Sequence, residues 1–373
     1  MGASELLRYM VEAGASDLHL RSGSTPFVRV DGRLEPTALS VLSPHDTEMV
    51  ASELLSARKR KDFDETHEAD AGFSMPGVGR FRVNVFRQRG EVSIAIRRVR
   101  TDSPSFEELR LPNVVRELAE APRGLVLVTG PAGTGKTTTI ASMISHINAT
   151  RRAHIVTIED PIEVVHTDQL SILDQREIGE DTLSFGAALR HVIRQDPDVI
   201  FIGEIRDSET AEAALSAAET GHLVISTMHT IDATETINRL LDLLPSTAQR
   251  QARFSLAASL RGTLSQRLVP RADDKGRVPA VEVMVNTGRV RDRILDPALT
   301  DSIPEVMEEG EFYGMQTFDQ ALVKLVVEGL VREADARSAS TNPHDFSLAL
   351  RAAEVHAPTP APPPTPAPSP APA

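Results

Sequence analysis

One short segment constrains this chain more than any other, because it specifies both a phosphate site and the local fold that carries it. It follows the apolar run 125–128, fits the pattern G-x-x-x-x-G-K-[ST], and consists of Gly130, Pro131, Ala132, Gly133, Thr134, Gly135, Lys136 and Thr137. In such a P-loop, backbone N–H groups wrap a phosphate chain, the lysine reaches the β- and γ-phosphates, and the last hydroxyl ligates Mg²⁺. We therefore expect ATP and Mg²⁺ as cofactors, with Thr138 also holding the nucleotide and Thr137 on the metal.

A helix should follow the P-loop and lie on a sheet. Apolar residues recur at helical spacing, at Ile140, Met143, Ile144 and Ile147. The N-terminal dipole of this helix would point at the phosphates. Short apolar runs then alternate with helical patterns, as a parallel α/β sheet requires; the strand candidates are residues 125–128, 155–158, 199–202 and 223–226. Ligands of such sheets bind at the carboxyl edge.

Acidic segments follow the second and third of these runs. They contain Glu163 and Glu204, and Gly203 stands where an aspartate commonly ends the third strand. Phosphoryl transfer needs one acid near the metal and another that orients or deprotonates the attacking water. Glu204 and Glu163 are therefore candidate catalytic residues, and we expect Glu204 to contact Mg²⁺ through water. The alternative is that each carboxylate only stabilises a helix N-terminus.

Two histidines, His222 and His229, bracket the fourth strand candidate. Their spacing, with no cysteine in the chain, does not resemble a zinc site. His229 lies at the carboxyl end of the strand, where an imidazole can hydrogen-bond the γ-phosphate or the attacking water. We take His229 as a further catalytic candidate. A structural histidine with satisfied hydrogen bonds remains the alternative for each.

Residues 1 to about 100 contain a hairpin that turns near Gly90. Its core face is predicted to consist of Phe81, Val83, Val85, Val92, Ile94 and Ile96. The opposite face then gathers Arg80, Arg82 and Arg97, for which the sequence offers no evident acidic partner. Clustered like charges destabilise a sheet unless water or an anion intervenes, so this face either binds phosphate or is a solvated edge.

Two further local patterns occur in the same region. The alternating run 28–34 enters an Asp31-Gly32 turn, which predicts a second hairpin. The basic run 58–61 follows a helical pattern, so we expect it to form the C-terminus of that helix, where the macrodipole favours positive charge.

Composition narrows the class of protein. The chain of 373 residues has 53 acidic and 40 basic side chains, a net charge of −13, which argues against nucleic acid as a partner. No apolar run approaches the roughly 18 residues that span a bilayer, so we expect a cytoplasmic protein. Residues 356–373 are almost entirely Pro, Ala, Thr and Ser, which predicts a disordered tail.

The motifs together resemble the secretion ATPase superfamily. The P-loop, an acidic box at 158–163, a Walker B segment at 196–207 and a His box at 220–230 stand in the order typical of that superfamily, in which glycine before the Walker B glutamate is normal. Residues 14–20 and 314–320 are similar to its PilT branch, the type IV pilus retraction ATPases. The resemblance covers about residues 5–350.

This resemblance implies an α/β protein with a PAS-like α+β domain at residues 1–100, a linker at 101–120, and a RecA-like P-loop ATPase domain at 121–355 before the tail. It implies a homo-hexameric ring with ATP between the two domains, and it assigns Arg82 and Arg97 to close on the phosphates. The implied work is pilus retraction, which drives twitching motility. The implied partner is a platform protein of the inner membrane, which would bring this protein to the cytoplasmic face of that membrane.

Other readings compete with retraction. Leu295 replaces an arginine that the retraction branch carries, although Arg291 is retained, and this difference leaves room for an accessory ring subunit that does not act as a motor. Extension and type II secretion ATPases share the motor but generally add a tetracysteine zinc module, and this chain has no cysteine. A nucleic-acid translocase would need stacking aromatics, whereas the chain has no tryptophan and only two tyrosines.

Overall fold

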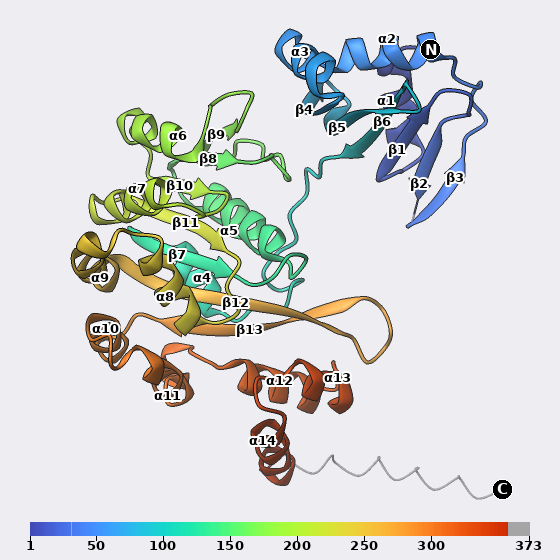
Figure 1. Ribbon diagram of the computed structural model, residues 1–373. Coiled ribbons are helices and arrows are strands. Elements are labelled where there is room, and N and C mark those ends of the chain that lie inside the picture. The colour runs from blue at the N-terminus through green and yellow to red at the C-terminus, as the bar shows by residue number, and fades with distance from the viewer. Residues whose placement is uncertain (31, 357–373) are drawn as a thin grey trace, which may run out of the picture.

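The computed structural model describes residues 1–30 and 32–356, which form two sheets (Figure 1). The predicted turn residue Asp31 and the predicted tail from residue 357 onward lie outside these residues. Within the described ranges, no helix combines the length and the apolar character needed to cross a membrane.

The first sheet is antiparallel, and its strands have the order β3-β2-β1-β6-β5-β4. The strands are β1 (Asp17–Arg21), β2 (Phe27–Val30), β3 (Arg33–Pro36), β4 (Glu68–Met75), β5 (Gly79–Gln88) and β6 (Glu91–Arg98). One apolar core joins this sheet to helices α1 (Ala3–Glu12), α2 (Pro44–Leu54) and α3 (Ala57–Thr66). This unit is the predicted PAS-like α+β domain.

The arginine hairpin has the predicted pairing. Strands β5 and β6 are joined through Arg89 and Gly90, and the six apolar residues assigned to the core face are all buried. Arg82 lies directly opposite Arg97 on the other face. Because successive side chains alternate between the faces of a strand, Asp17 of β1 shares this polar face. The predicted hairpin at 28–34 also forms, as β2 and β3.

The prediction for the basic run 58–61 is wrong. Helix α2 ends at Leu54, and a separate helix, α3, begins after Ser56. The Ser56 hydroxyl accepts a hydrogen bond from the backbone N–H of Lys59, so Ser56 is an N-cap. The basic residues therefore lie near the start of a helix rather than at the end of one. Lys59 lines a cavity against the polar face of the first sheet.

The second sheet has the order β13-β12-β7-β11-β10-β8-β9. Its parallel strands are β7 (Gly124–Thr129), β8 (His154–Glu159), β9 (Ile172–Glu177), β10 (Val199–Ile202) and β11 (Leu223–Met228). The four predicted strands are confirmed, whereas β9 was missed. Strand β9 is an edge strand whose last four residues are all polar, so it lacks the continuous apolar pattern of a strand buried on both faces.

Helices cover both faces of the second sheet (Figure 1). One face packs on α4 (Val114–Ala119) and on α5 (Lys136–Thr150), the helix predicted to follow the P-loop. The other packs on α6 (Phe185–Val192), α7 (Ser208–Glu219), α8 (Ala233–Asp242), α9 (Ser246–Ser259), α10 (Gly288–Leu295) and α11 (Ile303–Glu308), with η1 (Ile193–Gln195) directly after α6 and η2 (Thr300–Ser302) directly before α11 in the chain. The sheet is thereby buried on both sides, as the RecA-like domain requires.

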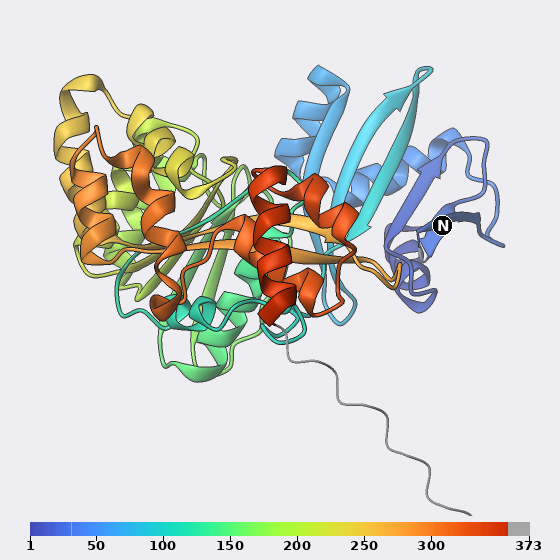
Figure 2. The same ribbon diagram turned by 90° about the horizontal axis from the view of Figure 1, so that it is seen from below.

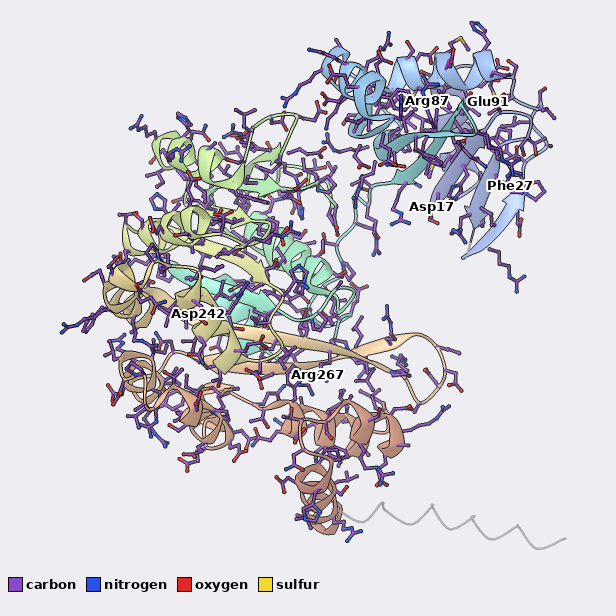
Figure 3. The ribbon with its side chains drawn as sticks, in the orientation of Figure 1. Asp17, Phe27, Arg87, Glu91, Asp242 and Arg267 are labelled. Carbon is purple, nitrogen blue, oxygen red and sulfur yellow. The ribbon has the colours of Figure 1, made fainter. Side chains whose placement is uncertain are left out.

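A C-terminal helical group lies against the end of this sheet. Strands β12 (Leu260–Pro270) and β13 (Arg277–Val285) form a long antiparallel ribbon. Turn η3 (Glu311–Tyr313) leads to α12 (Phe318–Val327), α13 (Glu333–Ala339) and α14 (Pro343–His356), which lie over the ribbon in Figure 2. Arg267 of β12 points toward this group (Figure 3), with its guanidinium 3.8 Å from the ring centroid of Phe318.

Candidate active site

A cavity of about 280 Å³ opens at the carboxyl edge of the second sheet. Its walls are the P-loop after β7, the acidic box after β8, Glu204 after β10 and His229 after β11. Because β11 lies between β7 and β10 in the sheet, His229 emerges between the P-loop and Glu204. The structure thus brings Lys136, Thr137, Glu163, Glu204 and His229 to one cavity.

The P-loop lysine already has hydrogen-bond partners without nucleotide. Lys136 Nζ donates to the carbonyl oxygens of Gly130, at 2.6 Å, and Pro131, at 2.9 Å. Burial lowers the pKa of Lys136, while the carboxylates of Glu204 and Glu163 act to raise it. To bind Lys136, phosphate oxygens must therefore replace these two carbonyl oxygens as acceptors of its hydrogen bonds.

Seven of the nine predicted nucleotide residues line one of two cavities, and Gly130 and Pro131 belong to neither lining. The 280 Å³ cavity is lined by Ala132, Gly133, Lys136 and Thr137. A second cavity of about 410 Å³ is lined by Thr134, Gly135 and Thr138. Gly130 has φ of 138°, and a Cβ there would lie 2.6 Å from the carbonyl oxygen of Gln266, so the loop requires glycine at this position.

Glu204 lies just after β10, and two basic side chains lie beside its carboxylate. Its side chain is 12% exposed, forms an ion pair with Arg206, and places Oε2 3.5 Å from Nε2 of His229. Gly203 precedes it, and a Cβ there would lie 3.2 Å from the carbonyl oxygen of Ile158. A side chain at position 203 would therefore require its neighbours to shift by a few tenths of an ångström.

The acidic box contributes one buried and one accessible carboxylate. Glu159 accepts hydrogen bonds from the Thr157 hydroxyl, at 2.6 Å, and from Nε2 of Gln175, at 3.2 Å. Burial raises the pKa of Glu159 to about 7, although these hydrogen bonds act to lower it. Glu163 is about half exposed, so its carboxylate can meet a bound nucleotide and its water.

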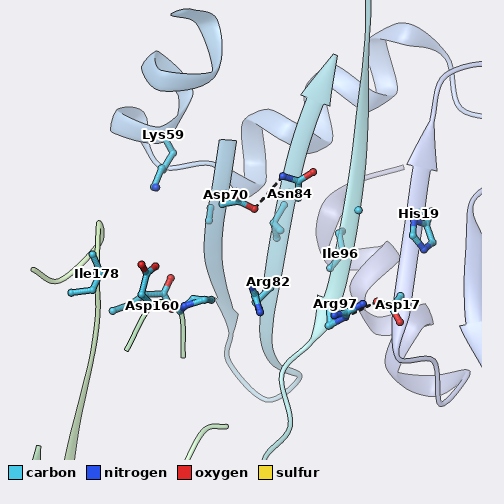
Figure 4. Close-up of a pocket in the computed structure, with 15 residues that line it drawn as sticks. Asp17, His19, Lys59, Asp70, Arg82, Asn84, Ile96, Arg97, Asp160 and Ile178 are labelled. Atoms are coloured by element: carbon cyan, nitrogen blue, oxygen red, sulfur yellow. Dashed lines mark hydrogen bonds and ion pairs between the residues drawn. The ribbon is translucent and has the colours of Figure 1, made fainter. Parts of the chain in front are cut away.

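The arginine face of the first sheet borders a different cavity, of about 460 Å³ (Figure 4). Arg82 and Arg97 line it, and the cavity shares Asp160 and Pro161 with the phosphate cavity. Nε of Arg97 donates to Oδ1 of Asp17 at 2.8 Å. Burial acts to raise the pKa of Asp17, but hydrogen bonds from Arg97 and Ser16 bring it below its usual value.

Carboxylates also face the other two arginines. Nη1 of Arg82 lies 3.9 Å from Oε1 of Glu163, and Nη2 of Arg80 lies 2.7 Å from Oε2 of Glu177. The expectation that this face lacks acidic partners is therefore wrong. The partners lie about 80 to 97 residues away in sequence, and a local pattern does not reveal them. The structure brings Arg82 to the acidic box but leaves Arg97 on Asp17, outside the lining of the phosphate cavity.

Sequence reasoning missed Glu159, Arg206 and Glu177 as members of this region. Glu159 and Arg206 lie inside the quoted motifs, and their place at strand ends was the available signal. Glu177 ends the missed strand β9, so recognising that strand would have placed it beside Glu159, its pairing partner on β8.

The fold and the site define a P-loop ATPase with a RecA-like core. Residues 3–334 match the family described as "Type II/IV secretion system protein". This match covers most of the chain, and the chain belongs to that family. The resemblance inferred from the sequence motifs is thereby confirmed.

The relatives include pilus motors. The chain is 41% identical to the type IV pilus retraction ATPase PilT of Pseudomonas aeruginosa, covering 93% of this chain and 100% of PilT. It is 40% identical to the type IV pilus ATPase PilU of the same organism, covering 94% and 92% of the two chains. A crystal structure of the pilus retraction motor PilT with bound ADP has a TM-score of 0.85 and 45% identity, covering 93% and 99%. The chain is an ATP hydrolase of the secretion ATPase superfamily.

The raised pKa of Glu159 predicts a pH-dependent stability difference. Between pH 4.5 and about 7 the unfolded chain loses this proton before the folded chain does, so the folded state loses stability as the pH rises through that window. The Glu159→Gln variant has no carboxyl group at this position, so it does not lose stability in this way as the pH rises. Without nucleotide, it should exceed wild type in unfolding free energy by about 1–3 kcal/mol at pH 8, and the difference should shrink toward pH 5. Urea unfolding at pH 5, 6.5 and 8 measures it; a pH-independent difference would contradict the assignment.

Proposed function

We propose that this chain is a motor ATPase that couples ATP hydrolysis to the retraction of type IV pili. The observation that carries the proposal is the contact between Arg82 and Glu163, which joins the first sheet to the wall of the phosphate cavity. A charge change in that cavity would alter the contact and move one domain relative to the other. The similarity to PilT supports retraction as the direction of the work.

The site supports specific roles for its side chains. Lys136 neutralises the β- and γ-phosphates. Thr137 and Glu204 hold Mg²⁺, and Glu204 does so through water. Mg²⁺ supplies charge neutralisation at the transferring phosphate. Glu163 orients the attacking water, and His229, 3.5 Å from Glu204, senses the γ-phosphate. Arg82 and Arg97 close on the phosphates from the first sheet, with residues 1–100 and 121–355 acting as the moving domains and 101–120 as the linker.

The remaining parts of the proposal concern assembly and location. Six copies would form a ring at the cytoplasmic face of the inner membrane. The partner would be a platform protein of the pilus base, and membrane contact would pass through that protein alone. Nucleic acid is not a proposed partner, because the chain carries a net charge of −13.

An accessory role in retraction is the second candidate. The chain is nearly as similar to PilU as to PilT, at 40% and 41% identity. Leu295, the last residue of α10, packs against the core at the position where the retraction branch carries an arginine. An accessory ring would still hydrolyse ATP but would depend on a second motor for retraction.

Two substitutions should separate nucleotide binding from turnover. Lys136→Ala should abolish productive binding of Mg·ATP, because it removes the cation that meets the phosphates. Glu204→Gln should keep binding and lower kcat by about 10²–10³. Equilibrium binding of a fluorescent ATP analogue and steady-state phosphate release measure the two effects. Near wild-type kcat in Glu204→Gln would refute its catalytic role.

The arginines of the first sheet should affect turnover more than affinity. Arg82→Ala and Arg97→Ala should each lower kcat, because both side chains must leave their carboxylates and close on the phosphates. The exposed Arg98 of β6 offers a matched control, and Arg98→Ala should keep wild-type turnover. If kcat stays unchanged in both Arg82→Ala and Arg97→Ala, this face is only a solvated edge.

Deletion of the gene should leave surface pili present or more abundant and should stop surface motility. Retraction removes pili, so a cell without the motor retains them. Pilus counts by electron microscopy, with a twitching assay on the same strain, measure the outcome. Cells without pili would instead indicate an extension motor, and wild-type counts with normal motility would indicate the accessory role.

A further inference from the structure

Glu177, the last residue of β9, joins the acidic box to the first sheet. Its Oε2 accepts the backbone N–H of Ile162 at 3.1 Å and lies 2.7 Å from Nη2 of Arg80. Ile162 immediately precedes Glu163 in the chain. One carboxylate, only 4% exposed, therefore holds both the backbone next to Glu163 and an arginine of the other domain.

The first sheet leaves room for this contact at Gly72 of β4. A Cβ at Gly72 would lie 2.7 Å from Nη2 of Arg80 and 2.8 Å from Oε1 of Glu177. Both distances are shorter than real Cβ contacts, so a side chain at position 72 would force the ends of the Arg80 and Glu177 side chains to shift. The backbone of β4 thus permits the close approach of the two charged groups.

The two ion pairs between the sheets differ in strength. Arg80 and Glu177 approach to 2.7 Å, with side chains 21% and 5% exposed. Arg82 and Glu163 are 3.9 Å apart, with side chains 43% and 47% exposed. Water screens an exposed pair and competes with it, whereas removal of one partner of a buried pair leaves an uncompensated charge. The Arg80–Glu177 pair is therefore suited to persist while ATP is bound and hydrolysed. The Arg82–Glu163 pair is suited to break, so that Arg82 can bind another anion.

We propose that Glu177 is a positioning residue for ATP hydrolysis. Its hydrogen bond from the Ile162 N–H fixes the position of the neighbouring residue Glu163. Its ion pair with Arg80 links that position to the first sheet. Glu177 does not line the phosphate cavity, so it acts through the acidic-box loop. Arg80 stays on Glu177 as a pivot while Arg82 exchanges Glu163 for the nucleotide. This inference rests on the proposed role of Glu163.

Single and double substitutions in the full-length chain test the pair. Glu177→Gln and Arg80→Gln should each lower kcat by about 10- to 100-fold, because small misplacements of catalytic groups have such effects. KM for Mg·ATP should stay unchanged, since the phosphate contacts remain. The double variant should be no slower than the slower single variant, because both changes break one contact. Arg80→Lys, which keeps the charge, should restore part of kcat, and Arg98→Gln should match wild type.

Gly72→Ala tests the same contact without altering either charged residue. It should lower kcat, because the added methyl group forces the ends of the Arg80 and Glu177 side chains out of their present positions. Gly288→Ala is a matched control, since a Cβ at position 288 meets no atom within 4 Å. Thermal unfolding by circular dichroism should give wild-type midpoints for Glu177→Gln and Arg80→Gln.

Three results would overturn the inference: wild-type kcat in Glu177→Gln, losses that add up in the double variant, or a loss of kcat matched by a lower unfolding midpoint. The last would indicate a purely structural contact. Glu204→Gln distinguishes this failure from failure of the proposed function. If Glu204→Gln is inactive while Glu177→Gln is fully active, only the role of Glu177 is wrong. If Glu204→Gln retains turnover, the assigned hydrolytic site itself is wrong.

Discussion

Parallel strand pairing is the constraint on which the site depends. Strands β7, β8, β10 and β11 run in one direction and are almost fully buried, so their carboxyl ends meet at one edge of the sheet. Polar side chains that follow these strands have few other places to lie. Lys136 and His229 therefore line the same cavity although 93 residues separate them in sequence. The order of the parallel strands therefore decides which side chains meet in the phosphate cavity.

Electrostatic pairing connects this edge to the first sheet. The basic groups aimed at the nucleotide region already have oxygen partners, Asp17 for Arg97 and Glu163 for Arg82. The Arg82–Glu163 pair is exposed on both sides and contributes about 0–1 kcal/mol, so a triphosphate can displace it at little cost. The Arg80–Glu177 pair is shorter and less exposed, so water competes with it less. Contacts of unequal strength between two domains favour rotation about the stronger one.

Local sequence patterns predicted much of the fold and part of the site. The P-loop, the helix after it and four parallel strands follow from apolar periodicity and glycine spacing, which are local properties. The partners of Arg80 and Arg97 could not be predicted from local patterns. Arg97 meets Asp17 through the pairing of β6 with β1, and Arg80 meets Glu177 of the other sheet. Strand β9 escaped detection because an edge strand does not need continuous apolar residues. The basic run 58–61 was misassigned because a hydroxyl at Ser56 starts a new helix.

The hydrogen bonds of Lys136 to its own loop have a consequence for product release. A buried ammonium group left without partners would hold on to ADP and phosphate, since their departure would strand a charge in a poorly solvated site. Here the carbonyl oxygens of Gly130 and Pro131 accept hydrogen bonds from Nζ of Lys136. Because the loop itself satisfies the ammonium group, the departure of phosphate does not strand its charge.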